Sequence, residues 1–143
     1  MTLTKEYRIK AGDFEKAGDA SLQIKTTLKS LDIYPDIIRR AAICAYESEM
    51  NIVMHGGGGT ITLTVDDSGI VLEVRDEGPG IEDVNLAFQE GYSTALMEHR
   101  EMGFGAGMGL PNIKKSSDFY EINSKLGKGT NLTIFFWQNR ESG

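Results

Sequence analysis

The sequence predicts an α/β sandwich in which helices cover one face of a mixed, mostly antiparallel sheet. Three observations favour this fold class: an alternating segment near the start of the chain, two long helical patterns after it, and two pairs of alternating segments joined by short turns. Strands that follow one another across tight turns pair antiparallel, and amphipathic helices bury one side against the sheet. With 143 residues and neither a repeat nor a linker, we expect a single domain over residues 1–143.

The first half of the chain supplies one strand and two helices. "YRIKA" (7–11) alternates as an edge strand does, and apolar residues recur every three or four positions after Asp13, which predicts a helix capped by that aspartate. Pro35 begins a second helix that runs to about His55, where "GGGG" (56–59) ends it. Its expected buried stripe is Ile38, Ala41, Ala45, Ser48 and Ile52.

The second half supplies two hairpins and a short helix. "TITLTV" (60–65) and "IVLEVR" (70–75) form a hairpin across "DDSG", whereas residues 82–101 are polar and weakly periodic, which favours a mobile cover. The remaining expected elements are a short helix over 110–116, then strands "FYEINS" (119–124) and "TNLTIFFWQN" (130–139), turned at "KLGKG".

Composition excludes several classes of function. The formal charge of −6 argues against general binding to nucleic acid or to an anionic membrane surface. The N-terminus lacks an apolar signal core, and no segment reaches the roughly 20 apolar residues of a membrane span, so we expect a cytoplasmic protein. Cys44 is the single cysteine and is expected to be a small buried side chain, while His55 and His99 lack partners at zinc-binding spacing.

A run of alternate glycines, "GFGAGMGLPNIKK" (103–115), needs an explanation because glycine is costly to order. Its spacing matches neither the dinucleotide-binding fingerprint nor the Walker loop. Two interpretations stay open. One is a surface loop, and the other is a lid that leads into a helix whose free N–H groups hold phosphates. The glycines concerned are Gly103, Gly105, Gly107 and Gly109.

Two further stretches carry polar residues suited to chemistry. Glu47 and Asn51 in "YESEMN" lie four apart and share one face of the second helix. Glu47 could accept a proton and the Asn51 oxygen could bind Mg²⁺, or both could belong to an exposed polar face. "VRDEGPGI" ends a strand with Asp76, which could accept a hydrogen bond from an exocyclic amine or simply begin a turn. Thr130 in "GKGT" could reach a phosphate or sit in an ordinary hairpin.

The order of these stretches resembles the GHKL ATPase superfamily, which includes gyrase, Hsp90, histidine kinases and MutL. The resemblance consists of Glu-x-x-x-Asn on a helix, Asp-x-Gly-x-Gly after a strand, a glycine-rich lid and Gly-x-Gly-Thr before a last strand, over residues 13–136. Within it, "YESEMNIVMHG", "EGYSTA" (90–95) and the glycine run are similar to RsbT-type switch kinases, and next to RsbW- and SpoIIAB-type kinases. "GGGG" and the inserted "LMEHREM" depart from the pattern.

The resemblance implies a Bergerat-type fold that binds ATP or ADP with Mg²⁺. It implies that Asp76 binds the adenine amino group, that Asn51 holds Mg²⁺ and that Glu47 is the catalytic base. The other nucleotide-binding residues that it implies are Gly78, Gly80, Arg100, Gly103, Gly105, Gly107, Gly109 and Thr130.

Four functions are compatible with this resemblance. The first is a protein serine/threonine kinase that phosphorylates a STAS-domain antagonist, and the second is an anti-sigma factor that sequesters a sigma factor. The third is a detached histidine-kinase catalytic domain, which is disfavoured because 143 residues leave no room for a phosphoacceptor hairpin. The fourth is a nucleotide-binding module without phosphotransfer. The resemblance also makes a homodimer an expectation.

Overall fold

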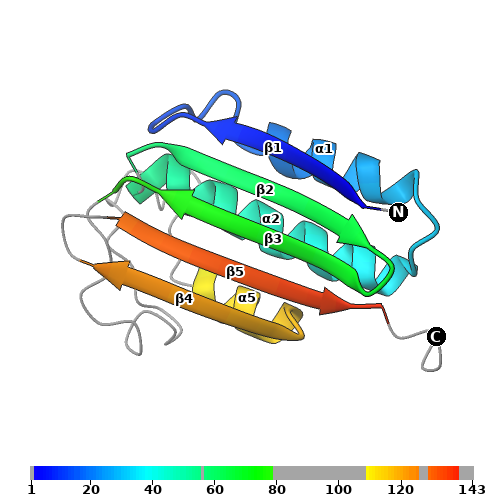
Figure 1. Ribbon diagram of the computed structural model, residues 1–143. Coiled ribbons are helices and arrows are strands. Elements are labelled where there is room, and N and C mark those ends of the chain that lie inside the picture. The colour runs from blue at the N-terminus through cyan, green and yellow to red at the C-terminus, as the bar shows by residue number, and fades with distance from the viewer. Residues whose placement is uncertain (1, 56, 79–108, 126–128, 139–143) are drawn as a thin grey trace.

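A five-stranded sheet with helices on one face organises the part of the chain that the structure describes (Figure 1). The computed structural model describes residues 2–55, 57–78, 109–125 and 129–138. The strands lie in the order β1-β2-β3-β5-β4, and each neighbouring pair is antiparallel. The elements are β1 (Leu3–Ile9), α1 (Asp19–Lys29), α2 (Pro35–His55), β2 (Gly59–Asp66), β3 (Gly69–Asp76), α5 (Gly109–Ser116), β4 (Phe119–Lys125) and β5 (Gly129–Trp137).

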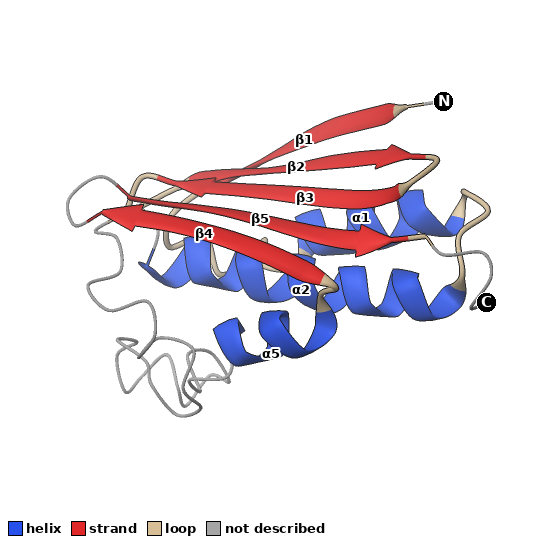
Figure 2. Cartoon of the chain, turned by 60° about the horizontal axis from the view of Figure 1, so that its bottom comes forward, coloured by secondary structure: helices blue, strands red, loops and turns tan. Residues whose placement is uncertain are grey.

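The expected sandwich is confirmed, with the difference that the described sheet is antiparallel throughout. Figure 2 shows α1, α2 and α5 as a layer against one face of the sheet, and no element in the described ranges covers the other face. The helices bury their apolar stripes against the inward side chains of the strands. The fully buried members of this core include Ile24, Leu28, Ala41, Ala45, Ile52, Ile61, Leu63, Leu72, Ile113 and Ile134.

Alternation in the strands explains which face of the sheet is covered. Ile61 and Leu63 of β2 pair with Val74 and Leu72 of β3, and all four are buried beneath the helices. The threonines between them point to the open face, because successive side chains of a strand lie on opposite sides. Both strands span the segments that the sequence predicts, extended by one residue at each end.

The helix α2 also agrees with expectation, since it spans Pro35–His55 and buries all five predicted residues of its stripe. It lies in the centre of the helical layer, with α1 on one side and α5 on the other (Figure 2). One edge of α2 therefore faces each neighbouring helix.

The predicted start of the first helix is wrong. The helix α1 begins at Asp19 rather than after Asp13, because Gly18 takes a left-handed conformation with φ of 102° that interrupts the helical path. Asp13 instead accepts a hydrogen bond from the N–H group of Lys16 at 3.4 Å, within a turn. Phe14 and Ala17 still pack against the core, so their apolar spacing reflects burial without a helix.

The ends of β1 and β5 also differ from the prediction. The edge strand β1 covers residues 3–9 rather than 7–11, because it pairs along the whole length of β2, from Leu3 opposite Val65 to Ile9 opposite Gly59. β5 ends at Trp137, two residues before the predicted end. Among the described helices, none is long and apolar enough to cross a membrane.

Candidate functional site

The first group of candidate residues lies where α2 meets the start of α5. Glu47 and Asn51 are partly buried on the edge of α2 that faces α5. A methyl group at Gly109, the first residue of α5, would lie 3.2 Å from Oδ1 of Asn51 and 3.3 Å from Oε2 of Glu47. Glycine at this position therefore lets the first turn of α5 approach both side chains closely.

Asn112 is a site residue that the sequence analysis missed. Its side-chain Nδ2 donates a hydrogen bond to Oε1 of Glu47 at 3.3 Å, which orients the carboxylate toward α5. The sequence could have indicated Asn112 as a site residue, because it lies in the first turn of the short helix that follows the glycine run. Burial raises the pKa of Glu47, and the Asn112 hydrogen bond opposes that shift in part. The carboxylate therefore holds a proton more tightly than an exposed glutamate does.

The N-terminus of α5 offers a positive end to this group. The first N–H groups of a helix have no partner within the helix, and the aligned peptide dipoles favour an anion there. In α5 these groups belong to Gly109 and Leu110, whereas Pro111 has no N–H group. A phosphate at this helix end would lie close to Glu47 and Asn51.

The second group lies at the end of β3 and is centred on Asp76. Its Oδ1 atom accepts two backbone hydrogen bonds, from Gly78 at 3.0 Å and from Thr130 at 3.2 Å. Burial raises the pKa of Asp76, and these two hydrogen bonds oppose the shift. Within the described ranges Oδ2 has no hydrogen-bond partner, so it is oriented and able to accept one from a ligand.

Thr130 lies opposite Asp76 in the pairing of β3 with β5. Its hydroxyl and the hydroxyl of Ser124 lie 2.8 Å apart and share a hydrogen bond. The backbone of Thr130 therefore orients Asp76, while its side chain contacts β4. The preceding Gly129 packs so closely on the carbonyl oxygen of Asp76 that no side chain fits between them.

The two groups lie at the same end of the sheet (Figure 1). The chain that leaves α2 packs against the residues after β3, because the N–H group of Glu77 donates to the carbonyl oxygen of Gly58 at 3.0 Å. A methyl group at Gly57 would lie 3.5 Å from the Cα atom of Gly78. The structure thus brings together the ends of α2 and β3 and the starts of β5 and α5.

The other predicted site residues lie outside the described residues. They are Gly80, Arg100, Gly103, Gly105 and Gly107, together with the predicted cover over 82–101 and its inserted "LMEHREM".

A second missed residue is Glu49, which is 2% exposed and turned toward α1. Its carboxylate accepts hydrogen bonds from three backbone N–H groups at the start of α1, those of Gly18 at 2.9 Å, Ala20 at 3.3 Å and Ser21 at 2.9 Å. α1 has no side-chain cap of its own, and Glu49 supplies one from α2. This carboxylate joins α2 to the start of α1 and is turned away from Glu47 and Asn51.

Comparison of the sequence with known proteins places this chain in a family. A family model described as histidine kinase-, DNA gyrase B- and HSP90-like ATPase matches residues 39–140. An anti-sigma F factor of Caldanaerobacter subterraneus subsp. tengcongensis is 36% identical over 107 residues, which cover 73% of this chain and 67% of that protein. The serine/threonine-protein kinase RsbT of Bacillus subtilis is 32% identical over 106 residues, which cover 70% of this chain and 74% of that protein. An anti-sigma F factor of Clostridium acetobutylicum is 27% identical over 125 residues, 84% of each chain.

The match of the family model includes both groups of candidate residues, from Glu47 on α2 to Thr130 on β5. The antiparallel sheet covered by helices on one face is consistent with the family that the sequence similarity indicates. This chain belongs to the family of histidine kinase-, DNA gyrase B- and HSP90-like ATPases, the GHKL superfamily.

Proposed function

We propose that this protein is an ATP-dependent serine/threonine kinase of a bacterial sigma-factor regulatory pathway, with a STAS-domain antagonist as its substrate. The observation that carries the proposal is the contact of Glu47 and Asn51 with the first residue of α5. That contact puts a carboxylate and an amide oxygen beside the N-terminus of a helix, where an anion is favoured. Similarity to RsbT, which is named a serine/threonine-protein kinase, supports phosphotransfer to a protein hydroxyl.

The base of the nucleotide would bind at the end of β3. Oδ2 of Asp76, which has no hydrogen-bond partner among the described residues, would accept a hydrogen bond from the adenine amino group, while Oδ1 stays on its two backbone donors. Gly78 is buried beside Asp76, and in this proposal its bare backbone and that of Gly80, which lies outside the described residues, would let the flat ring approach. Adenine is preferred because its exocyclic group is a donor, whereas guanine presents a carbonyl acceptor at the same place.

The phosphates would lie between the glycine run and α5. The N–H groups of Gly109 and Leu110 donate to phosphate oxygens. In this proposal Gly103, Gly105 and Gly107 would supply further backbone donors, and Arg100 would contact the γ-phosphate. These roles explain why glycine recurs at alternate positions, since a phosphate cradle needs close approach of the backbone.

The donor set suits Mg²⁺. In the described part of the chain no group of three or more His, Cys, Asp and Glu residues could hold a metal. Mg²⁺ needs few protein ligands, because it keeps several waters and binds phosphate oxygens. Oδ1 of Asn51, beside the start of α5, would hold it, and the ion would neutralise charge on the phosphates during transfer.

Glu47 would act as the base for transfer. It takes the proton from a serine or threonine hydroxyl as that oxygen bonds to the γ-phosphorus, and the bond from phosphorus to the β–γ bridging oxygen breaks to release ADP. The raised pKa of Glu47 favours this role, because a base that holds a proton more tightly accepts it more readily. Asn112 positions the carboxylate through its hydrogen bond to Oε1.

The test separates binding from transfer. Calorimetric titration with Mg·ATP should give micromolar affinity in the wild type and in Glu47→Gln, and at least about tenfold weaker binding in Asp76→Asn. Transfer of labelled γ-phosphate to a STAS-domain protein from the same organism should be lost in Glu47→Gln. Glu121→Gln, an exposed carboxylate on β4, is the matched control and should behave as wild type. Wild-type transfer rates in Glu47→Gln would remove it as the base.

A second function has support from the relatives. Seven of the similar proteins are named anti-sigma F factor, among them those of Caldanaerobacter, Thermoanaerobacter and Clostridium species. In that case the chain would sequester a sigma subunit, and phosphotransfer would release it. Affinity capture of a sigma subunit, in an amount that falls when the STAS-domain protein is added, would establish this role. Recovery of the STAS-domain protein alone favours the kinase.

A further inference from the structure

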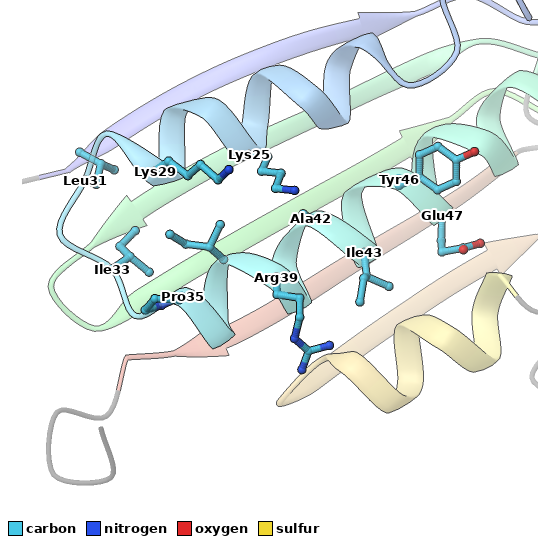
Figure 3. A pocket seen from close by; sticks show the side chains of 11 residues that line it. Lys25, Lys29, Leu31, Ile33, Pro35, Arg39, Ala42, Ile43, Tyr46 and Glu47 are labelled. Carbon is cyan, nitrogen blue, oxygen red and sulfur yellow. The ribbon is translucent and has the colours of Figure 1, made fainter.

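An open groove crosses the outer surface of the helical layer between α1 and α2 (Figure 3). Its volume is about 690 Å³, within the range of about 300–1,000 Å³ that ligand clefts span. Ile38, Ala42 and Ile43 of α2 contribute apolar surface, and Glu47 lines the groove at one end. A chain that lies in this groove therefore reaches the residue proposed to take the proton from the substrate hydroxyl.

The groove is basic although the protein as a whole carries a charge of −6. Lys25 and Lys29 lie one turn apart on α1 and extend toward α2 (Figure 3). Both are exposed, and neither forms an ion pair with any residue that the structure describes. Arg39 adds a third cation. Its guanidinium forms an exposed ion pair with the carboxylate of Asp36 at 2.8 Å. Such exposed pairs exchange readily for another carboxylate.

Tyr46 adds a contact surface next to Glu47. Its side chain is 44% exposed and lines the same groove. Exposed aromatic rings beside a polar rim are typical of protein-binding surfaces, because they bury much area at a small entropic cost. The cations can bind acidic side chains, while the apolar residues and the tyrosine ring can bind apolar ones. The groove therefore suits a peptide segment that carries both kinds of side chain.

We propose that this groove binds an acidic segment of the protein substrate and thereby delivers its acceptor hydroxyl to Glu47. The proposal rests on the proposed kinase function and names the chemistry of its substrate. Two observations identify the occupant: the lysines, which have no ion-pair partner in the described part of the chain and are complementary to carboxylates, and the presence of Glu47 in the lining of the groove. Lys25 and Lys29 would act on substrate binding and leave nucleotide binding unchanged.

A charge exchange tests the groove directly. The probe is a short fluorescent peptide in which glutamates and leucines flank one serine, and its partner replaces each glutamate by lysine. Fluorescence anisotropy should show that Lys25→Glu/Lys29→Glu binds the acidic peptide at least about tenfold more weakly and gains affinity for the basic one. Lys5→Glu/Lys10→Glu makes the same charge change on and beside β1, where both lysines are exposed, and should not alter the preference.

The outcomes separate this proposal from the kinase itself. Equal binding of the acidic peptide by the wild type and both variants would overturn the groove proposal. A change of oligomeric state in sedimentation that accompanies lost binding would assign the groove to a second copy of the chain and also overturn it. Calorimetry with Mg·ATP on the wild type reports separately on the proposed function, because the peptide measurement needs no nucleotide. With labelled ATP, the Lys25/Lys29 variant should raise the KM for the peptide and keep kcat.

Discussion

Replacing Glu49 by glutamine tests how the helical layer is held together. The buried carboxylate accepts one hydrogen bond at Oε1, from Ser21, and two at Oε2, from Gly18 and Ala20. Glutamine keeps only one acceptor oxygen. Whichever way the amide turns, its NH₂ group faces at least one backbone N–H group of α1, and both are donors.

The structure sets the size of the effect. One buried N–H group left without an acceptor costs about 1–3 kcal/mol, and loss of the charge at a helix N-terminus costs up to about 2 kcal/mol in a buried setting. Relief from burying a charge offsets part of this. We therefore expect Glu49→Gln to lower the free energy of unfolding by about 2–4 kcal/mol, which corresponds to a fall in Tm of roughly 6–15 °C for a domain of this size.

Urea denaturation followed by circular dichroism measures this change. Glu73→Gln on β3, where the glutamate is exposed on the open face of the sheet, is the matched control and should stay within about 0.5 kcal/mol of wild type. Hydrogen exchange of the Ser21 amide should accelerate in Glu49→Gln, because its acceptor is weakened. A Glu49→Gln protein as stable as Glu73→Gln would refute the capping role.

Three further predictions follow from burial and close packing. Burial raises the pKa of Asp76 above its unfolded value. The stability that this shift contributes is therefore present below the unfolded pKa and is lost as pH rises through the folded pKa. Urea denaturation across about pH 3–7 should show this loss in the wild type and not in Asp76→Asn. Gly129→Ala should destabilise the protein by about 3 kcal/mol or more in thermal unfolding, because the methyl group would collide with the carbonyl oxygen of Asp76 and φ is 88°. Burial raises the pKa of Cys44 to about 12, so a thiol reagent should modify it only after denaturant is added; rapid modification of the native protein would contradict this.

Elements with a clear period were predictable from the sequence alone. The helix α2 shows its apolar stripe at intervals of three and four, and its ends carry Pro35 and a glycine run. β2 alternates between threonines and buried apolar residues, and in β3 Leu72 and Val74 alternate with Glu73 and Arg75, so the position of both strands followed from the pattern to within one residue at each end. The burial of Cys44 was also expected and is confirmed. Local patterns are reliable here because each element buries one continuous face.

The start of α1 could not be predicted in the same way. The local signal favoured Asp13, but the cap comes from Glu49, which lies 28 residues or more from the N–H groups that it holds. The limits of β1 likewise depend on its partner strand, because pairing with β2 extends it into a polar segment. Neither signal is present in the sequence that surrounds the element itself.

The sequence by itself determined the fold class and the candidate residues Glu47, Asn51, Asp76 and Thr130, because each lies at a recognisable place in a helix, a strand end or a turn. Only the tertiary structure decided which of them meet. It packs Gly109 against Glu47 and Asn51, adds a hydrogen bond from Asn112 to the carboxylate of Glu47, and orients Asp76 with an N–H group from β5. The physical reason is that hydrogen bonds and packing between distant segments depend on how the helices and strands dock, which no local pattern encodes.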